Sequence, residues 1–162
     1  MTIQKNYFKK FTRKKIPISD PRIKRLITRS IEFIGDFPVL KKIFNGKKNI
    51  SSEITIRFTD EIESKQLNKT YRKKHYPTNV LTFTYDHFPT LIADIVLCIP
   101  IIEKECSEKK IKFDHHIAHL IVHGTLHAAG FDHNNEETAK IMENLEIIIL
   151  KRFNISNPYT KN

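Results

Sequence analysis

The sequence has only two cysteines and four glycines, and it has no apolar run near the about 20 residues of a membrane-spanning helix. Two cysteines are too few for a disulfide scaffold, so Cys98 and Cys106 are expected to be reduced thiols of a cytosolic protein. The few glycines and the seven prolines exclude collagen-like and linker-like chains. The N-terminus lacks the apolar core and the cleavage site of a secretory signal. We therefore expect a cytoplasmic protein.

The composition that remains is that of an ordinary globular protein. The 162 residues, of which 40% are apolar and 28% charged, predict one domain over residues 1–162. Alternating apolar residues predict strands over 54–58 and 80–85, and residues 91–99, apolar on both faces, predict a central strand. Residues 36–52 are expected to form a loop, and helical spacing predicts helices over 20–35, 60–71, 100–109, 114–129 and from Asn134 or Asn135 to Leu150. This arrangement favours a compact α/β or α+β domain.

Positive charge is concentrated in the first third of the chain. Residues 1–50 contain fourteen Lys and Arg and three acidic residues, whereas residues 51–162 contain fourteen and fifteen. Residues 1–18 are expected to form a basic N-terminal arm. Such clustered charge attracts polyanions and favours contact with nucleic acid or with a membrane surface. A generally high lysine content is the alternative explanation.

Six of the eight histidines gather in one short segment. His123 and His127 are four residues apart in a predicted helix, so their side chains leave the same face about 6 Å apart and can bind one cation. His119 is on the same stripe, but it lies about 12 Å along the helix axis from His127, so a straight helix cannot aim all three at one ion. Gly130 can reverse the chain and return His133 toward the pair, which makes His133 the third candidate ligand.

The spacing of His123, His127 and His133 matches the extended zinc-protease pattern H-E-x-x-H-x-x-G-x-x-H, except that Gly124 stands where the proteases have a general-base Glu. A peptidase would lose its proton acceptor there, and we expect the glycine to leave room beside the metal. Three neutral imidazoles leave a zinc ion its full charge, which suits a phosphodiester. An open fourth position would hold a water of pKa about 7. A closed structural zinc site is the alternative, although no cysteine accompanies the histidines.

A second group of polar residues could support the site or bind its substrate. Arg72, followed by Lys73, ends a predicted helix, and an arginine fork can grip a phosphate; a solvated basic helix end is the alternative. Asp94 is the only charge in an apolar strand, so we expect a buried carboxylate that supports the structure or the metal ligands. Asp132 is placed to orient a ligand histidine or to handle a proton. His119 is a further candidate for a supporting role.

Four segments of the chain carry a resemblance to known proteins, namely Leu67-Asn68…Tyr71-Arg72, Thr78-Asn79-Val80-Leu81, Asp94-Ile95-Val96 and His119 to His133. Together they resemble the YbeY family of metal-dependent endoribonucleases, also called rRNA maturation factors. The resemblance runs from about residue 54 to residue 150. It implies an α+β fold with a small mixed sheet packed with helices and a metal at the end of a long central helix. It also implies that His123, His127 and His133 bind zinc and that Arg72 is functional.

The activity that the resemblance implies is cleavage of single-stranded RNA in 16S rRNA 3′-end maturation and in ribosome quality control. We therefore predict a zinc-dependent endoribonuclease with one zinc ion per chain, no organic cofactor and Arg72 as a catalytic residue. Its partners would be rRNA and the small ribosomal subunit rather than a membrane. The nucleophile is either water or a ribose 2′-hydroxyl. A metallopeptidase and a non-catalytic ribosome-binding factor with structural zinc are the alternative functions.

Overall fold

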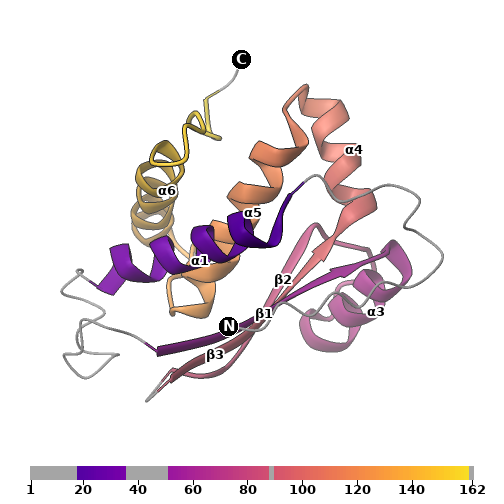
Figure 1. Cartoon of the computed structure of the whole chain (residues 1–162). Helices are drawn as coiled ribbons and strands as arrows, with labels where there is room; N and C mark the ends of the chain where they lie inside the picture. The colour runs from indigo at the N-terminus through magenta and orange to yellow at the C-terminus, as the bar shows by residue number, and fades with distance from the viewer. Residues whose placement is uncertain (1–17, 36–50, 88–89, 161–162) are drawn as a thin grey trace.

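The structure is a computed structural model that describes residues 18–35, 51–87 and 90–160. The predicted basic arm, apart from Ile18, and most of the predicted loop lie outside these residues. None of the helices in the described part of the chain is long and apolar enough to cross a membrane. The elements, labelled as in Figure 1, are α1 (Asp20–Gly35), β1 (Ser51–Thr59), α3 (Glu61–Arg72), β2 (Val80–Asp86), β3 (Thr90–Cys98), α4 (Ile99–Lys109), α5 (Phe113–Ala128) and α6 (Glu136–Lys151).

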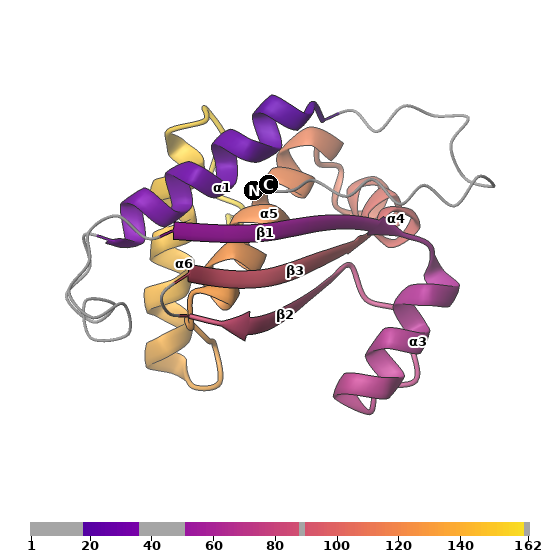
Figure 2. The same cartoon turned by 60° about the horizontal axis from the view of Figure 1, so that its bottom comes forward.

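The three strands form a mixed sheet in the order β1-β3-β2 (Figure 2). β1 runs parallel to β3, and β2 runs antiparallel to it. The position of β3 between the other two confirms the prediction of a central strand, although the strand spans Thr90–Cys98 and the predicted last residue, Ile99, begins α4. β1 begins at Ser51, three residues before the predicted start, because Ser51–Glu53 pair with Thr90–Ile92. The first two residues of this segment are serines, so the apolar alternation on which the prediction depended does not reveal it.

α5 is the central helix of the fold. It packs against β2 and β3 on one side and against α1, α4 and α6 on the others. Ile117, Ile121, Val122 and Leu126 of α5 are fully buried in the resulting core. Figure 1 shows α1, α5 and α6 on one side of the sheet. This arrangement of helices beside a small mixed sheet confirms the α+β class.

α3 extends from the end of β1 and carries the chain to the loop before β2. Asp60 begins the helix because its carboxylate accepts a backbone N–H of the first turn at 2.8 Å. Lys73 ends it in the left-handed conformation, with φ of 59°. Two buried side chains hold the following loop. Ser64 bonds both the N–H and the carbonyl of Thr78, at 3.0 and 2.8 Å, and Asn68 donates to a loop carbonyl at 2.7 Å. The loop is therefore fixed to the helix.

Candidate metal centre

Four histidines follow one stripe of α5, namely His116, His119, His123 and His127. Residues three or four apart on a helix lie on the same face, and successive rings of this stripe are 4.5–6.2 Å apart between centroids. Each ring has a different hydrogen-bond environment. The stripe therefore combines candidate ligands at one end of α5 with supporting polar contacts along the rest.

His133 joins His123 and His127 beyond the C-terminal end of α5. Its ring centroid lies 5.6 Å from that of His123 and 4.8 Å from that of His127. The chain reverses at Gly130, whose φ of 94° is a conformation that favours glycine. One nitrogen from each of the three rings lies within 4.8 Å of the others. The structure thus brings together the three residues that the spacing selects, which we call the histidine triad.

The orientation of His127 is fixed by its own helix end. Its Nδ1 lies 3.0 Å from the carbonyl oxygen of Phe131, which can only accept, so Nδ1 carries the proton and Nε2 has the lone pair. Burial lowers the pKa of His127 to about 4, and the nearby His123 and His133 contribute to this shift. The ring is therefore neutral at pH 7, which is the form that binds metals.

His123 is oriented by a buried carboxylate that the sequence analysis missed. Glu146 of α6 is 0% exposed, and its Oε1 lies 2.8 Å from Nδ1 of His123. Burial alone would raise the pKa of Glu146, but hydrogen bonds from His119 and His123 lower it to about 2. The ionised carboxylate only accepts, so Nδ1 of His123 donates and Nε2 is left for a metal. Its position four residues after Met142 and three before Ile149 places Glu146 on the buried stripe of α6, a signal visible in the sequence.

Two further side chains complete the surroundings of Glu146. His119 Nε2 lies 2.6 Å from the second carboxylate oxygen, Oε2. The Tyr159 hydroxyl, from the segment after α6, donates to the same oxygen. Burial and the contact with the carboxylate raise the pKa of Tyr159, so the phenol keeps its proton. His119, His123 and Glu146 are also close enough to share a cation, but their N···O separations of 2.6 and 2.8 Å are those of hydrogen bonds.

The donor set of the triad fits a divalent transition metal. Zinc takes imidazole nitrogens readily, and catalytic zinc sites use three protein ligands with a fourth position open. A ligand histidine in such sites usually donates its other ring nitrogen to a carboxylate or a carbonyl. His123 donates to Glu146 and His127 donates to the Phe131 carbonyl. Two of the three rings therefore already have the orientation that metal binding requires.

The triad opens into a cavity of about 610 Å³ between α3, β2 and the end of α5. Arg72, from the last turn of α3, lines this cavity together with all three histidines, Tyr71 and the residues 78–84. Pockets for small organic ligands typically have volumes of about 300–1,000 Å³. The cavity is therefore large enough for part of an organic substrate, and Arg72 and the triad belong to the same lining.

Gly124 does not have the role that its position in the motif suggested. A Cβ atom built on Gly124 would lie 2.8 Å from Cγ2 of Ile95 and 3.1 Å from Oγ1 of Thr82. The expectation that this glycine leaves room beside a metal is therefore wrong, because β2 and β3 fill the space. Its physical role is the close approach of α5 to the sheet. A glutamate at this position would have to displace buried side chains.

The remaining candidate residues differ in their position relative to the cavity. Asp132 is exposed and lines the cavity, and a backbone N–H two residues later lowers the pKa of its carboxyl. Lys73 does not line the cavity; its Nζ bonds a carbonyl of its own helix at 2.9 Å. Asp94 is half-buried rather than buried and accepts the Tyr85 hydroxyl at 2.9 Å. Its neighbour Ile95 faces α5, so Asp94 points to the opposite face of the sheet, away from the triad.

A second buried polar network holds the wall of the cavity. His116 is 6% exposed, and its Nε2 lies 2.6 Å from Oε2 of Glu105 on α4. The side-chain amide of Asn79 donates to both oxygens of Glu105, at 3.0 and 3.1 Å. Asn79 lines the cavity at the start of β2. The network therefore joins α4, α5 and β2 behind the cavity, through residues that the sequence analysis did not single out for this role.

Three imidazoles close enough to share one ion, in a cavity that Arg72 also lines, form a site of the kind that hydrolytic metalloenzymes use. A family model described as "Endoribonuclease YbeY" matches residues 9–154. The chain therefore belongs to the YbeY endoribonuclease family, which confirms the resemblance seen in the motifs.

Individual relatives agree with this assignment. A protein of Polynucleobacter asymbioticus named Endoribonuclease YbeY is 45% identical over 134 residues, which are 82% of this chain and 86% of the relative. A protein of Janthinobacterium sp. with the same name is 42% identical over 143 residues, covering 86% and 89%. The solution structure of TM1509 from Thermotoga maritima aligns with a TM-score of 0.50 at 22% identity, over 88% of this chain and 95% of that one. The last similarity concerns the fold alone.

Proposed function

We propose that this protein is a zinc-dependent endoribonuclease that cleaves single-stranded RNA. The observation that carries the proposal is the presence of the histidine triad and Arg72 in one cavity, in a chain whose curated relatives are named endoribonucleases. A divalent ion held by His123, His127 and His133 would act as a Lewis acid on the phosphodiester. An RNA substrate is consistent with the basic character of the whole chain, whose net charge is +10.

The residues of the chain have separate roles in this proposal. Arg72 contacts a non-bridging phosphate oxygen and neutralises the charge that develops during cleavage, as a guanidinium fork does well. Glu146 and the Phe131 carbonyl keep His123 and His127 in the tautomers that bind a metal. Asp132 lines the cavity and is available to accept a hydrogen bond from a substrate hydroxyl.

The cellular role that we propose is maturation of the 16S rRNA 3′ end and ribosome quality control in the cytoplasm. The small ribosomal subunit would be the partner, and neither an organic cofactor nor a membrane would be involved. Membership of the YbeY family, and the resemblance of the motifs to those of rRNA maturation factors, support this role.

The test is cleavage of a labelled single-stranded rRNA fragment by the purified protein, with and without a chelator. We expect cleavage that the chelator abolishes and that added Zn²⁺ restores. His127→Ala should abolish both cleavage and zinc binding. Glu143→Gln, on the exposed face of α6, is the matched control. Absence of cleavage by the folded, zinc-loaded wild type, on naked RNA and on ribosomal particles, would refute the proposal and leave a binding factor with structural zinc. Cleavage of an unfolded protein substrate would instead support a metallopeptidase.

A further inference from the structure

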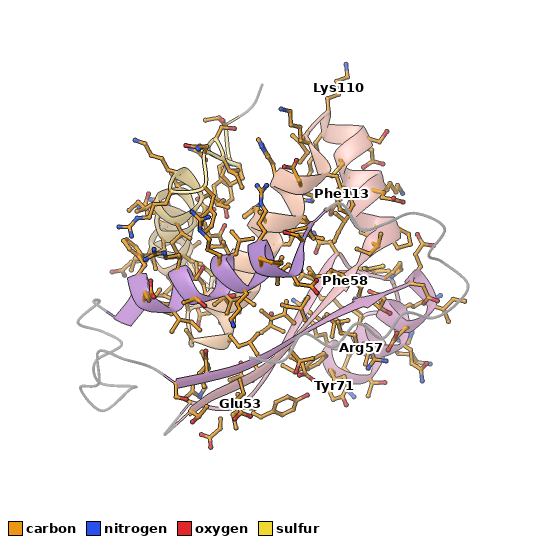
Figure 3. The ribbon with its side chains drawn as sticks, in the orientation of Figure 1. Glu53, Arg57, Phe58, Tyr71, Lys110 and Phe113 are labelled. Carbon is orange, nitrogen blue, oxygen red and sulfur yellow. The ribbon has the colours of Figure 1, made fainter. Side chains whose placement is uncertain are left out.

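An exposed aromatic ring lies in the same cavity as the histidine triad. Tyr71, in the last turn of α3, is 63% exposed, and its ring contacts Phe83 of β2 edge-to-face with centroids 4.8 Å apart. Tyr71 and Phe83 both belong to the lining of the cavity, as does Arg72. Figure 3 shows Tyr71 on the side of the sheet that faces away from α1 and α5. We call this pair the Tyr71–Phe83 shelf.

Packing within the protein does not account for the position of Tyr71. A tyrosine that packs in the core has most of its ring buried, and its hydroxyl usually forms a hydrogen bond. The Tyr71 ring is mostly exposed, and its hydroxyl has no hydrogen-bond partner among the described residues. Tyr85 differs in this respect, because its hydroxyl donates to Asp94 at 2.9 Å. The contact with Phe83 orients the Tyr71 ring and leaves ring surface open to a ligand.

The basic residues that follow Tyr71 suit a polyanion, and a carboxylate on this face is that of Asp94, the cross-strand neighbour of Phe83. Arg72 follows Tyr71 directly, and the cationic side chains of Lys73 and Lys74 come next. Ser64 and Asn68 of α3 bond the loop that follows the basic residues and forms a wall of the cavity. The end of α3 and this loop therefore keep a fixed arrangement. Proteins that bind single-stranded nucleic acids combine positive charge along the backbone with aromatic rings on which bases stack.

We propose that Tyr71, supported by Phe83, stacks on an unpaired base of the RNA and holds the adjoining phosphate between Arg72 and the histidine triad. This inference rests on the proposed function and names the feature of the substrate that the site selects. A base inside a duplex is stacked on its neighbours and cannot offer its face to the ring. The shelf is therefore the determinant of specificity for single strands.

The experiment measures binding before cleavage, so that it does not depend on turnover. A short fluorescent single-stranded RNA is titrated with chelator-treated protein, using the wild type, Tyr71→Leu and Tyr71→Phe. Tyr71→Leu keeps an apolar contact with Phe83 but has no aromatic face, and we expect binding to weaken about 5- to 100-fold. Tyr71→Phe should bind within about 2-fold of the wild type, since it keeps the ring. Tyr76→Leu, which removes a ring of similar exposure from a residue outside the cavity lining, is the matched control and should bind normally.

A second substrate separates stacking from a structural effect of the substitution. Removal of one base from the RNA, at the position that the shelf contacts, should weaken wild-type binding and leave Tyr71→Leu unaffected. Equal binding and equal cleavage by the wild type and Tyr71→Leu would overturn this inference alone. A wild type that neither binds nor cleaves single-stranded RNA would overturn the proposed function and this inference with it.

Discussion

Replacement of Glu146 by glutamine tests how much the ionised carboxylate beside the histidine triad stabilises the folded protein. The pKa of the Glu146 carboxyl falls from 4.5 to about 2 in the folded protein, and at 1.36 kcal/mol per pKa unit this corresponds to about 3 kcal/mol. Glutamine has nearly the shape of the protonated carboxyl, so Glu146→Gln should reduce the free energy of unfolding at pH 7 by up to about 3 kcal/mol. Urea denaturation of the metal-free protein measures this change.

The sign of the pH dependence gives the same prediction a second test. The native pKa of Glu146 is depressed, so its stabilisation is present above pH 4.5 and is lost as the pH falls toward about 2. The wild type and Glu146→Gln should therefore converge in stability over this range. Glu143→Gln, one turn earlier on the exposed face of α6, should stay within about 0.5 kcal/mol of the wild type. If Glu146→Gln were no more destabilising than this control at pH 7, the reasoning would be refuted.

The same substitution should also weaken zinc binding. Glu146 accepts from Nδ1 of His123, and loss of such a supporting carboxylate typically weakens metal binding about 10- to 100-fold. Competition with a coloured chelator measures the affinity without reference to activity. An unchanged affinity would mean that Glu146 stabilises the fold and not the orientation of His123.

Three further predictions follow from other parts of the site. Arg72→Ala should retain zinc affinity within about 2-fold but lower the rate of RNA cleavage about 10- to 100-fold, because a charge-assisted phosphate contact is lost; a wild-type rate would exclude its catalytic role. Gly124→Ala should reduce stability by about 1 kcal/mol, because overpacking against Ile95 at 2.8 Å outweighs the gain in helix propensity; a stabilised variant in urea denaturation would contradict this. The metal-free protein should lose stability from pH 6.5 to about 4, because the unfolded chain protonates His127 first; His127→Gln should flatten this slope, and an unchanged slope would assign it elsewhere.

Local patterns were sufficient to predict most of the fold. Apolar periodicity located the central strand β3 and the helix α5, and the reversal at Gly130 placed His133 beside the other two histidines. These features depend on residues close together in the sequence. The start of the last helix also depends on nearby residues. The sequence predicts a cap at Asn134 or Asn135, and in the structure the Asn135 side chain accepts from the backbone N–H of Thr138.

Contacts between distant elements could not be predicted in this way. Gly124 was interpreted through its place in a motif, whereas the physical constraint comes from Ile95 on β3. The apolar strand around Asp94 predicts a buried carboxylate, but the face on which Asp94 lies depends on the register of the sheet. Glu146 lies on the apolar stripe of α6 and could have been flagged by its spacing, but its partners His119 and His123 are fixed only when α6 packs on α5.

The positions of His123, Glu146 and Tyr159 in the sequence set the order in which the hydrogen-bond support of the centre is made during synthesis. His123 is made first, its partner Glu146 follows 23 residues later, and Tyr159 is reached 36 residues after His123. At about 5–20 residues per second, this interval is about 2–7 s. During that time the growing chain gains His127 and then His133, the other two candidate ligands, before the hydrogen-bond support of His123 is complete. A centre that we propose to act on ribosomal RNA thus receives its last support only when the chain has been made as far as Tyr159.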